Sequence, residues 1–70
     1  MMPLILADRE EEKIIVKVGG NPETRKFLEN LGFVPGALVT VVNEIGGNVI
    51  VNVKESRIAV SRELAGKIMV

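Results

Sequence analysis

The sequence contains no cysteine, no histidine, no tryptophan and no tyrosine. Without cysteine or histidine, the chain has no disulfide, no thiolate nucleophile, no soft-metal ligand and no side chain that ordinarily titrates near neutral pH. Its folded state therefore has to rest on packing alone. Because no set of residues supports catalysis, we predict a protein that is not an enzyme and needs no cofactor.

The charges balance, with nine basic and nine acidic residues. Such a chain lacks the positive field from which nucleic-acid binders draw most of their non-specific affinity. The two phenylalanines, Phe27 and Phe33, are the only aromatic residues. They are too few for the stacking platforms that bind single-stranded nucleic acids, or for an aromatic groove that binds proline-rich peptides. We therefore expect no nucleic-acid partner.

The first ten residues, "MMPLILADRE", hold a short apolar patch but no basic leader, no long apolar run and no small-residue cleavage pattern. These features predict neither a signal peptide nor a membrane-spanning segment, and so a cytoplasmic protein without direct membrane insertion. At 70 residues the chain has the length of a single domain, residues 1–70, with a small core.

Hydrophobic residues make up 47% of the chain and are mostly valine, isoleucine and leucine, which favour strands. In "KIIVKV", residues 13–18, alternation places Ile14, Val16 and Val18 on the apolar face of a half-buried first strand. The segments "ALVTVVNEI" and "NVIVNV" are expected to pair antiparallel through Gly46-Gly47, a two-residue connection suited to a hairpin turn.

In the last third of the chain, the sequence predicts a fourth strand at "RIAV", with Ile58 and Val60 facing inward. Ser61 is expected to cap a short helical turn, and "IMV", residues 68–70, forms a fifth strand. The fold class is thus mainly β: a small, partly open five-stranded barrel with one inserted helix and a short helical turn before the last strand. Open strand edges in such a barrel permit weak self-association.

The inserted helix is expected to run from about Pro22 to Leu31, with Asn21 as its N-cap. Thr24, Phe27, Leu28 and Leu31 lie on one side of this helix, which we expect to be buried. Gly32 should end the helix in a left-handed conformation, with Phe33 folding back onto Leu28, and Pro35-Gly36 should form a type II turn into the next strand.

Two polar segments suggest ligand sites, and each has a simpler explanation. Gly19-Gly20, before the helix, could hold a phosphate on free amides, but the segment lacks a phosphate-loop signature and also suits a flexible joint. Asp8 and the run from Glu10 to Glu12 could bind a hard cation, but consecutive residues rarely converge on one ion. A solvated turn is the expected state of this acidic segment.

Large apolar residues outnumber what so small a barrel readily encloses, which indicates an apolar patch for another protein. The alternative is that they complete the core or lie singly on the surface. For Phe27 and Leu28 both interpretations stay open. The residues in question are Ile5, Ile15, Phe27, Leu28, Ile50 and Met69.

The segments "FLENLGFVPGALVTVV" and "RIAVSRELAGKIMV" resemble the FeoA family, small cytoplasmic proteins associated with bacterial ferrous-iron uptake. The resemblance extends over nearly the whole chain, although "PLILA" and the first strand fit more loosely. It implies an SH3-like barrel, no catalysis, and a supporting role to FeoB, the membrane transporter with a cytoplasmic GTPase domain. Many members have a longer hairpin connection containing "LGDP", where this chain has "EIGGNV".

The resemblance also implies a site for the transporter on the helix and on the bend that follows it. Leu28 is expected to be the direct contact, whereas the glycines and the proline shape the surface. The alternative function is a stand-alone metal-responsive module that binds Fe²⁺ or Mn²⁺ through the acidic segment, although no metal-ligand set is assigned. The residues that match the family motif are Phe27, Leu28, Leu31, Gly32, Pro35 and Gly36.

Overall fold

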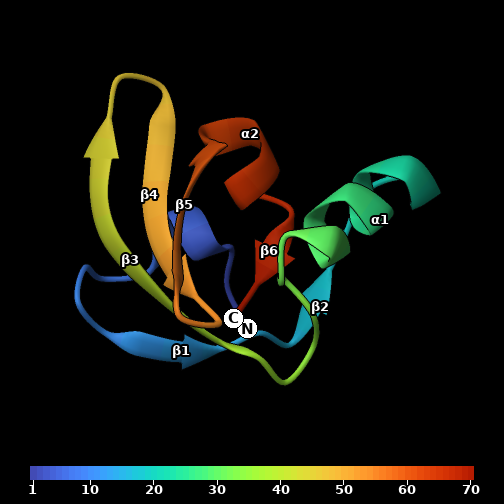
Figure 1. The fold of residues 1–70 in the computed structure, drawn as a ribbon, viewed down its shortest axis with the longest axis horizontal. Helices are drawn as coiled ribbons and strands as arrows, with labels where there is room; N and C mark the ends of the chain where they lie inside the picture. The colour runs from blue at the N-terminus through green and yellow to red at the C-terminus, as the bar shows by residue number, and fades with distance from the viewer.

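The computed structural model describes residues 1–70 and shows a mainly β chain with two α-helices and one turn of 3-10 helix (Figure 1). In chain order the elements are η1 (Leu4–Leu6), β1 (Glu12–Ile14), β2 (Lys17–Val18), α1 (Pro22–Asn30), β3 (Leu38–Ile45), β4 (Asn48–Val53), β5 (Ser56–Ser61), α2 (Arg62–Ala65) and β6 (Ile68–Met69).

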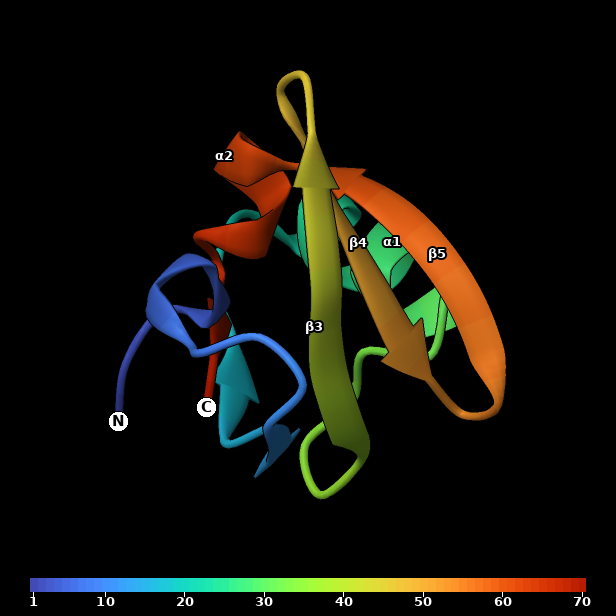
Figure 2. The same ribbon diagram turned by 90° about the vertical axis from the view of Figure 1, so that its left-hand side faces the viewer.

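The strands form two antiparallel sheets, one in the order β1-β3-β4-β5 and a smaller one that pairs β2 with β6. Helix α1 lies on the side of the molecule away from the β3–β4 hairpin tip, and α2 lies between them (Figures 1 and 2). The two chain ends lie side by side because Met2 and Val70 exchange backbone hydrogen bonds of 2.9 and 2.8 Å.

The segment expected as one first strand is shared between the two sheets. The amide of Ile15 donates to Ala37 at 2.9 Å, beside β3, and the amide of Val16 donates to Met69 on β6 at 2.7 Å. This segment therefore joins the sheets, which is why the structure has six strands where five were expected.

The predicted inward face of that segment is wrong at two of three positions. Ile14 and Val16 are 59% and 52% exposed, whereas Ile15 is buried and Val18 packs partly against the core. Because Ile14, Ile15 and Val16 are all apolar, the alternation in the sequence does not determine which of them face inward. The inward residues, Ile15 and Val18, are three apart, because the strand is interrupted between β1 and β2.

The β3–β4 hairpin is confirmed, with Gly46 at φ +61° in its two-residue turn. Its register shifts between Val41 and Asn43, which marks a β-bulge at Val42. A bulge adds one residue to one strand and so reverses which face the following residues occupy. Ile45 consequently pairs with Asn48 and is exposed, whereas Val39 and Val41, which precede the bulge, are buried.

The remaining predicted elements are confirmed. β5 buries Val60 and half-buries Ile58, and the hydroxyl of Ser61 accepts from the amide of Leu64 at 3.1 Å as the N-cap of α2. Ile68 on β6 is fully buried. No helix of the structure has both the length and the apolar character needed to cross a bilayer.

A single cluster of buried side chains fills the space between the sheets and the helices. One member, Leu4, comes from η1, an element that the sequence pattern did not indicate. The cluster consists of Leu4, Ile15, Leu28, Phe33, Val39, Val41, Val49, Val51, Val53, Val60, Ala65 and Ile68.

Candidate binding site around helix α1

Helix α1 begins at Pro22, as its sequence predicts, and ends at Asn30, one residue before the predicted Leu31, which is its C-cap. The Asn21 side chain accepts from the amide of Thr24 at 2.8 Å, which satisfies one of the free donors at the helix start. At the other end, the amide of Gly32 donates to Glu29 at 2.9 Å and that of Phe33 donates to Leu28 at 3.0 Å. With Gly32 at φ +108°, these bonds form a Schellman motif.

The bend after the helix is a tight turn that is tied to the barrel. The amide of Ala37 donates to the carbonyl of Val34 at 3.0 Å, and Gly36 has φ +91°, as a type II turn requires. The amide of Gly36 also donates to Ile15 at 2.8 Å. The amides of Gly36 and Ala37 are therefore used within the chain, and this bend, residues 32–36, turns the chain into β3. We call it the elbow.

Leu28, which was expected to be the direct contact, is fully buried. That expectation is wrong in this structure, because Leu28 packs in the core with Phe33 and holds α1 against the barrel. Phe27 is instead 52% exposed, although it was placed on the buried side of the helix. Successive helical residues differ by about 100° in direction, so burying Leu28 turns Phe27 toward the edge of the interface.

The six residues of the expected site do not form one exposed patch. Leu31 and Gly32 are half-buried, whereas Pro35 and Gly36 are exposed in the elbow. Phe27 lies two residues from both Arg25 and Glu29, which places it on roughly the opposite side of α1 from them. We call the exposed ring of Phe27, together with Leu31 one turn later, the Phe27 ridge.

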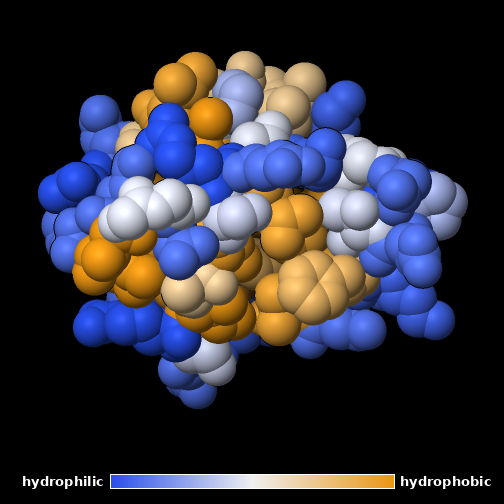
Figure 3. All heavy atoms as spheres, turned by 90° about the horizontal axis from the view of Figure 1, so that it is seen from above, coloured by the Kyte–Doolittle hydropathy of each residue, from blue (hydrophilic) through white to orange (hydrophobic).

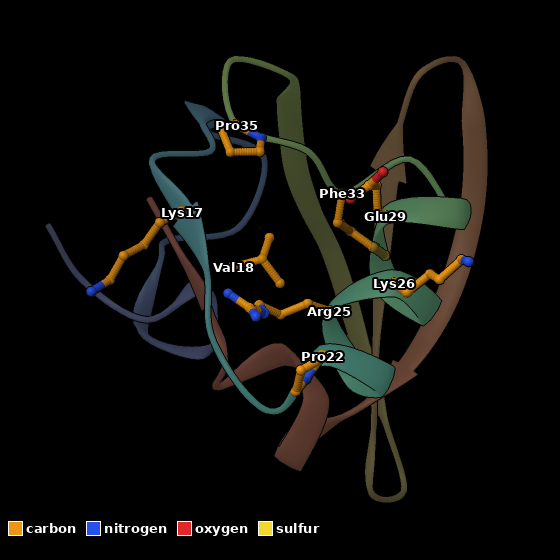
Figure 4. A pocket seen from close by; sticks show the side chains of 8 residues that line it. All are labelled: Lys17, Val18, Pro22, Arg25, Lys26, Glu29, Phe33 and Pro35. Carbon is orange, nitrogen blue, oxygen red and sulfur yellow. The ribbon is translucent and has the colours of Figure 1, made fainter.

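The side of α1 opposite the Phe27 ridge borders a groove that was not expected from the sequence (Figure 4). This groove has a volume of about 460 Å³ and lies between α1, β2 and the elbow. Its polar residues on α1 are spaced three and four apart, a spacing that could have indicated a shared face. The groove is lined by Lys17, Val18, Pro22, Arg25, Lys26, Glu29, Phe33 and Pro35.

The two polar segments considered as ligand sites have structural explanations. The amide of Gly19 already donates to Lys67 at 2.7 Å, and Gly20 has φ +98°. A Cβ on Gly20 would lie 3.1 Å from the Lys67 side chain and 3.2 Å from that of Thr24, so glycine is needed for the turn itself. In the acidic segment, Glu11 pairs with Lys13 at 2.6 Å. No group of three or more carboxylates lies close enough to hold a metal ion.

Apolar side chains are also exposed outside α1. Ile14 and Leu38, cross-strand partners on β1 and β3, are 59% and 48% exposed, and Ile45 near the hairpin tip is 61% exposed. Seen from above, apolar side chains form a band just below the middle of the surface and a second group at its top edge, with hydrophilic side chains at both ends (Figure 3). Exposed apolar surface is therefore present on more than one part of the barrel.

Comparison with known proteins points to one family. The family model that describes the FeoA domain matches residues 2–70 of this chain. A curated relative from Methanocaldococcus jannaschii, named "Putative Fe(2+) transport protein A", is 37% identical over 70 residues, which are all of this chain and 85% of the relative.

Two solved structures show the same fold. The crystal structure of an iron uptake regulatory protein, FeoA, is 31% identical, has a TM-score of 0.88, and aligns over 97% of this chain and 90% of its own. Stenotrophomonas maltophilia FeoA in complex with zinc, described as a prokaryotic SH3 domain protein, is 24% identical with a TM-score of 0.84, over 99% and 88% of the two chains. The expected SH3-like barrel is thus confirmed, and the chain belongs to the FeoA family of ferrous iron transport accessory proteins.

Proposed function

We propose that this chain is a non-enzymatic, cytoplasmic accessory protein of ferrous iron uptake that binds the cytoplasmic part of a FeoB-type membrane transporter through the Phe27 ridge. Membership of the FeoA family and the Fe²⁺ transport name of the M. jannaschii relative support the role in iron transport. The choice of binding surface rests on one observation. Phe27 is 52% exposed, although the next residue of the same helix, Leu28, is fully buried.

An exposed phenylalanine on a rigid helix is suited to be an anchor in an interface. A fully buried Phe side chain contributes about 1.5–3 kcal/mol, and roughly half of that remains to be gained at Phe27 when a partner covers it. The helix is held by Leu28 and by the Schellman motif at its end, so little ordering of the backbone opposes binding. Gly32, Pro35 and Gly36 then act by fixing the direction of α1 rather than by contact.

Binding alone does not alter a transporter, because a partner with equal affinity for two conformations shifts neither population. The accessory protein therefore acts by binding more tightly to one conformation of the transporter's cytoplasmic part. A tenfold preference for that conformation corresponds to about 1.4 kcal/mol, which one well-buried aromatic anchor can supply.

The test is calorimetric titration of the chain into the isolated cytoplasmic part of the transporter. Phe27→Ser is expected to weaken binding by about fivefold to tenfold, since it removes the anchor. Ile45→Ser is the matched control, because it removes a large apolar side chain of similar exposure near the hairpin tip. Circular dichroism shows whether both variants stay folded. Equal affinity of the wild type and of Phe27→Ser would remove the Phe27 ridge from the interface.

A further inference from the structure

The groove on the other side of α1 combines unpaired cations with an apolar floor. Val18, which is half-buried, supplies the accessible floor, and the exposed rings of Pro22 and Pro35 add apolar surface to its lining, whereas Phe33 borders the groove from within the core and is fully buried. Its volume of about 460 Å³ lies in the range of ~300–1,000 Å³ that is usual for ligand-binding clefts. The Phe27 side chain takes no part in this lining.

Arg25 is the central polar group of the groove. Its side chain extends from α1 across the opening toward Val18 on β2 (Figure 4). The guanidinium group makes no hydrogen bond and no ion pair within the chain, even though Glu29 lies four residues later on the same helix. Its donors are therefore available for a planar, bidentate acceptor such as a carboxylate.

The surroundings of Arg25 make this part of the surface positive. The groove is lined by three cationic side chains, those of Lys17, Arg25 and Lys26, and by one carboxylate, that of Glu29, which gives a net charge of +2. The chain as a whole has no net charge. Lys17 and Lys26 extend outward on opposite sides of Arg25 (Figure 4), where they add to the positive field at the rim.

We infer that this groove binds an acidic segment of a partner protein, with a carboxylate accepting hydrogen bonds from Arg25 and an apolar side chain resting on the floor. A segment with acidic residues around one apolar residue complements both the charge and the floor of the groove. This inference goes beyond the transporter contact at the Phe27 ridge and does not depend on it, because the two surfaces lie on opposite sides of α1.

The test is an NMR titration. Backbone amide signals of the isotope-labelled chain are recorded while a short acidic peptide, acetyl-Glu-Asp-Leu-Glu-Asp-amide, is added. Signals of Val18, Arg25, Lys26 and Glu29 are expected to shift with the acidic peptide. They are expected to stay in place with the isosteric neutral peptide, acetyl-Gln-Asn-Leu-Gln-Asn-amide. Raising the salt concentration from about 0.05 M to about 0.5 M should weaken the binding, since the groups are exposed and salt screens them.

Substitutions that remove either a positive or a negative charge from the groove should change the Kd in opposite directions. Arg25→Gln is expected to raise the Kd for the acidic peptide by about fivefold or more, with Arg25→Lys in between because it keeps the charge but loses the planar donor pair. Glu29→Gln should lower the Kd by about twofold, since it removes the only negative charge in the groove. Arg9→Gln, which removes an exposed arginine outside the groove, and Phe27→Ser should leave the Kd unchanged.

Three outcomes would overturn the inference. One is a set of shifts outside the groove, and another is a peptide Kd that Arg25→Gln and Glu29→Gln do not change. The third is binding of inorganic phosphate at the same residues without binding of the acidic peptide, which would show a small-anion site instead. Far-UV circular dichroism of each variant shows that any loss is not a loss of fold.

Discussion

The backbone amide of Phe33 donates to the carbonyl of Leu28 at 3.0 Å, and both side chains are fully buried in the same core cluster. This pairing ties the end of α1 to the start of the elbow in both backbone and side chain. It fixes the rotation of α1 about its own axis. The same rotation leaves Phe27 on the surface and directs Arg25 across the groove.

Truncating Leu28 is therefore expected to lower the free energy of unfolding much more than truncating Phe27. Leu28→Ala should lower the free energy of unfolding by about 2–5 kcal/mol, because it opens a cavity in a small core. Phe27→Ala should change it by no more than about 1 kcal/mol, since half of the ring is already in water. Urea denaturation followed by circular dichroism measures both values. If the two losses were alike, the assignment of Leu28 to the core and Phe27 to the surface would be wrong.

The conformation at Gly32 gives a second prediction. Gly32→Ala should cost about 1–2 kcal/mol, because a Cβ at φ +108° strains the backbone. The added Cβ meets the side chains of Lys54 at 3.5 Å and Val53 at 3.8 Å, both ordinary contact distances, so the cost reflects strain rather than a clash. Gly47→Ala is the control, since Gly47 has no positive φ and no atom within 4 Å of an added Cβ. Thermal unfolding should show a lower Tm for the first variant alone.

The bulge at Val42 predicts a difference between two apolar residues at the hairpin end. Ile45→Ala should change the free energy of unfolding by about 0.5 kcal/mol or less, because the bulge turns Ile45 to the solvent. Val49→Ala, which truncates a buried residue on the facing strand, should cost about 2 kcal/mol. Equal effects in chemical denaturation would mean that β3 alternates without interruption.

Elements whose signals are local could be predicted from the sequence. The cap at Asn21, the left-handed Gly32, the Pro35-Gly36 turn and the two-residue hairpin turn each depend on the chemistry of a few adjacent residues. The inward face of β4 can also be read from its strict alternation, because the buried Val49, Val51 and Val53 are separated by polar or less buried residues. These parts needed no knowledge of distant contacts.

The remaining parts depend on which segments meet in space. Ile15 is buried because its strand joins two sheets, and Leu4 is buried because η1 packs beside α2. The helical pattern allowed both Phe27 and Leu28 to face inward, and only the packing of α1 onto the core, which buries Leu28 and leaves Phe27 half exposed, decides between them. The groove was missed because its lining joins α1 to residues from β2 and the elbow.

The transporter contact at the Phe27 ridge is tested most directly by amide signals of the isotope-labelled chain during titration with the unlabelled cytoplasmic part of the transporter. We expect the signals of Phe27, Leu31 and their neighbours on α1 to shift or broaden, while those around Ile45 at the hairpin tip stay unchanged. No change in any signal at saturating concentration, or changes confined to the hairpin tip, would contradict this expectation.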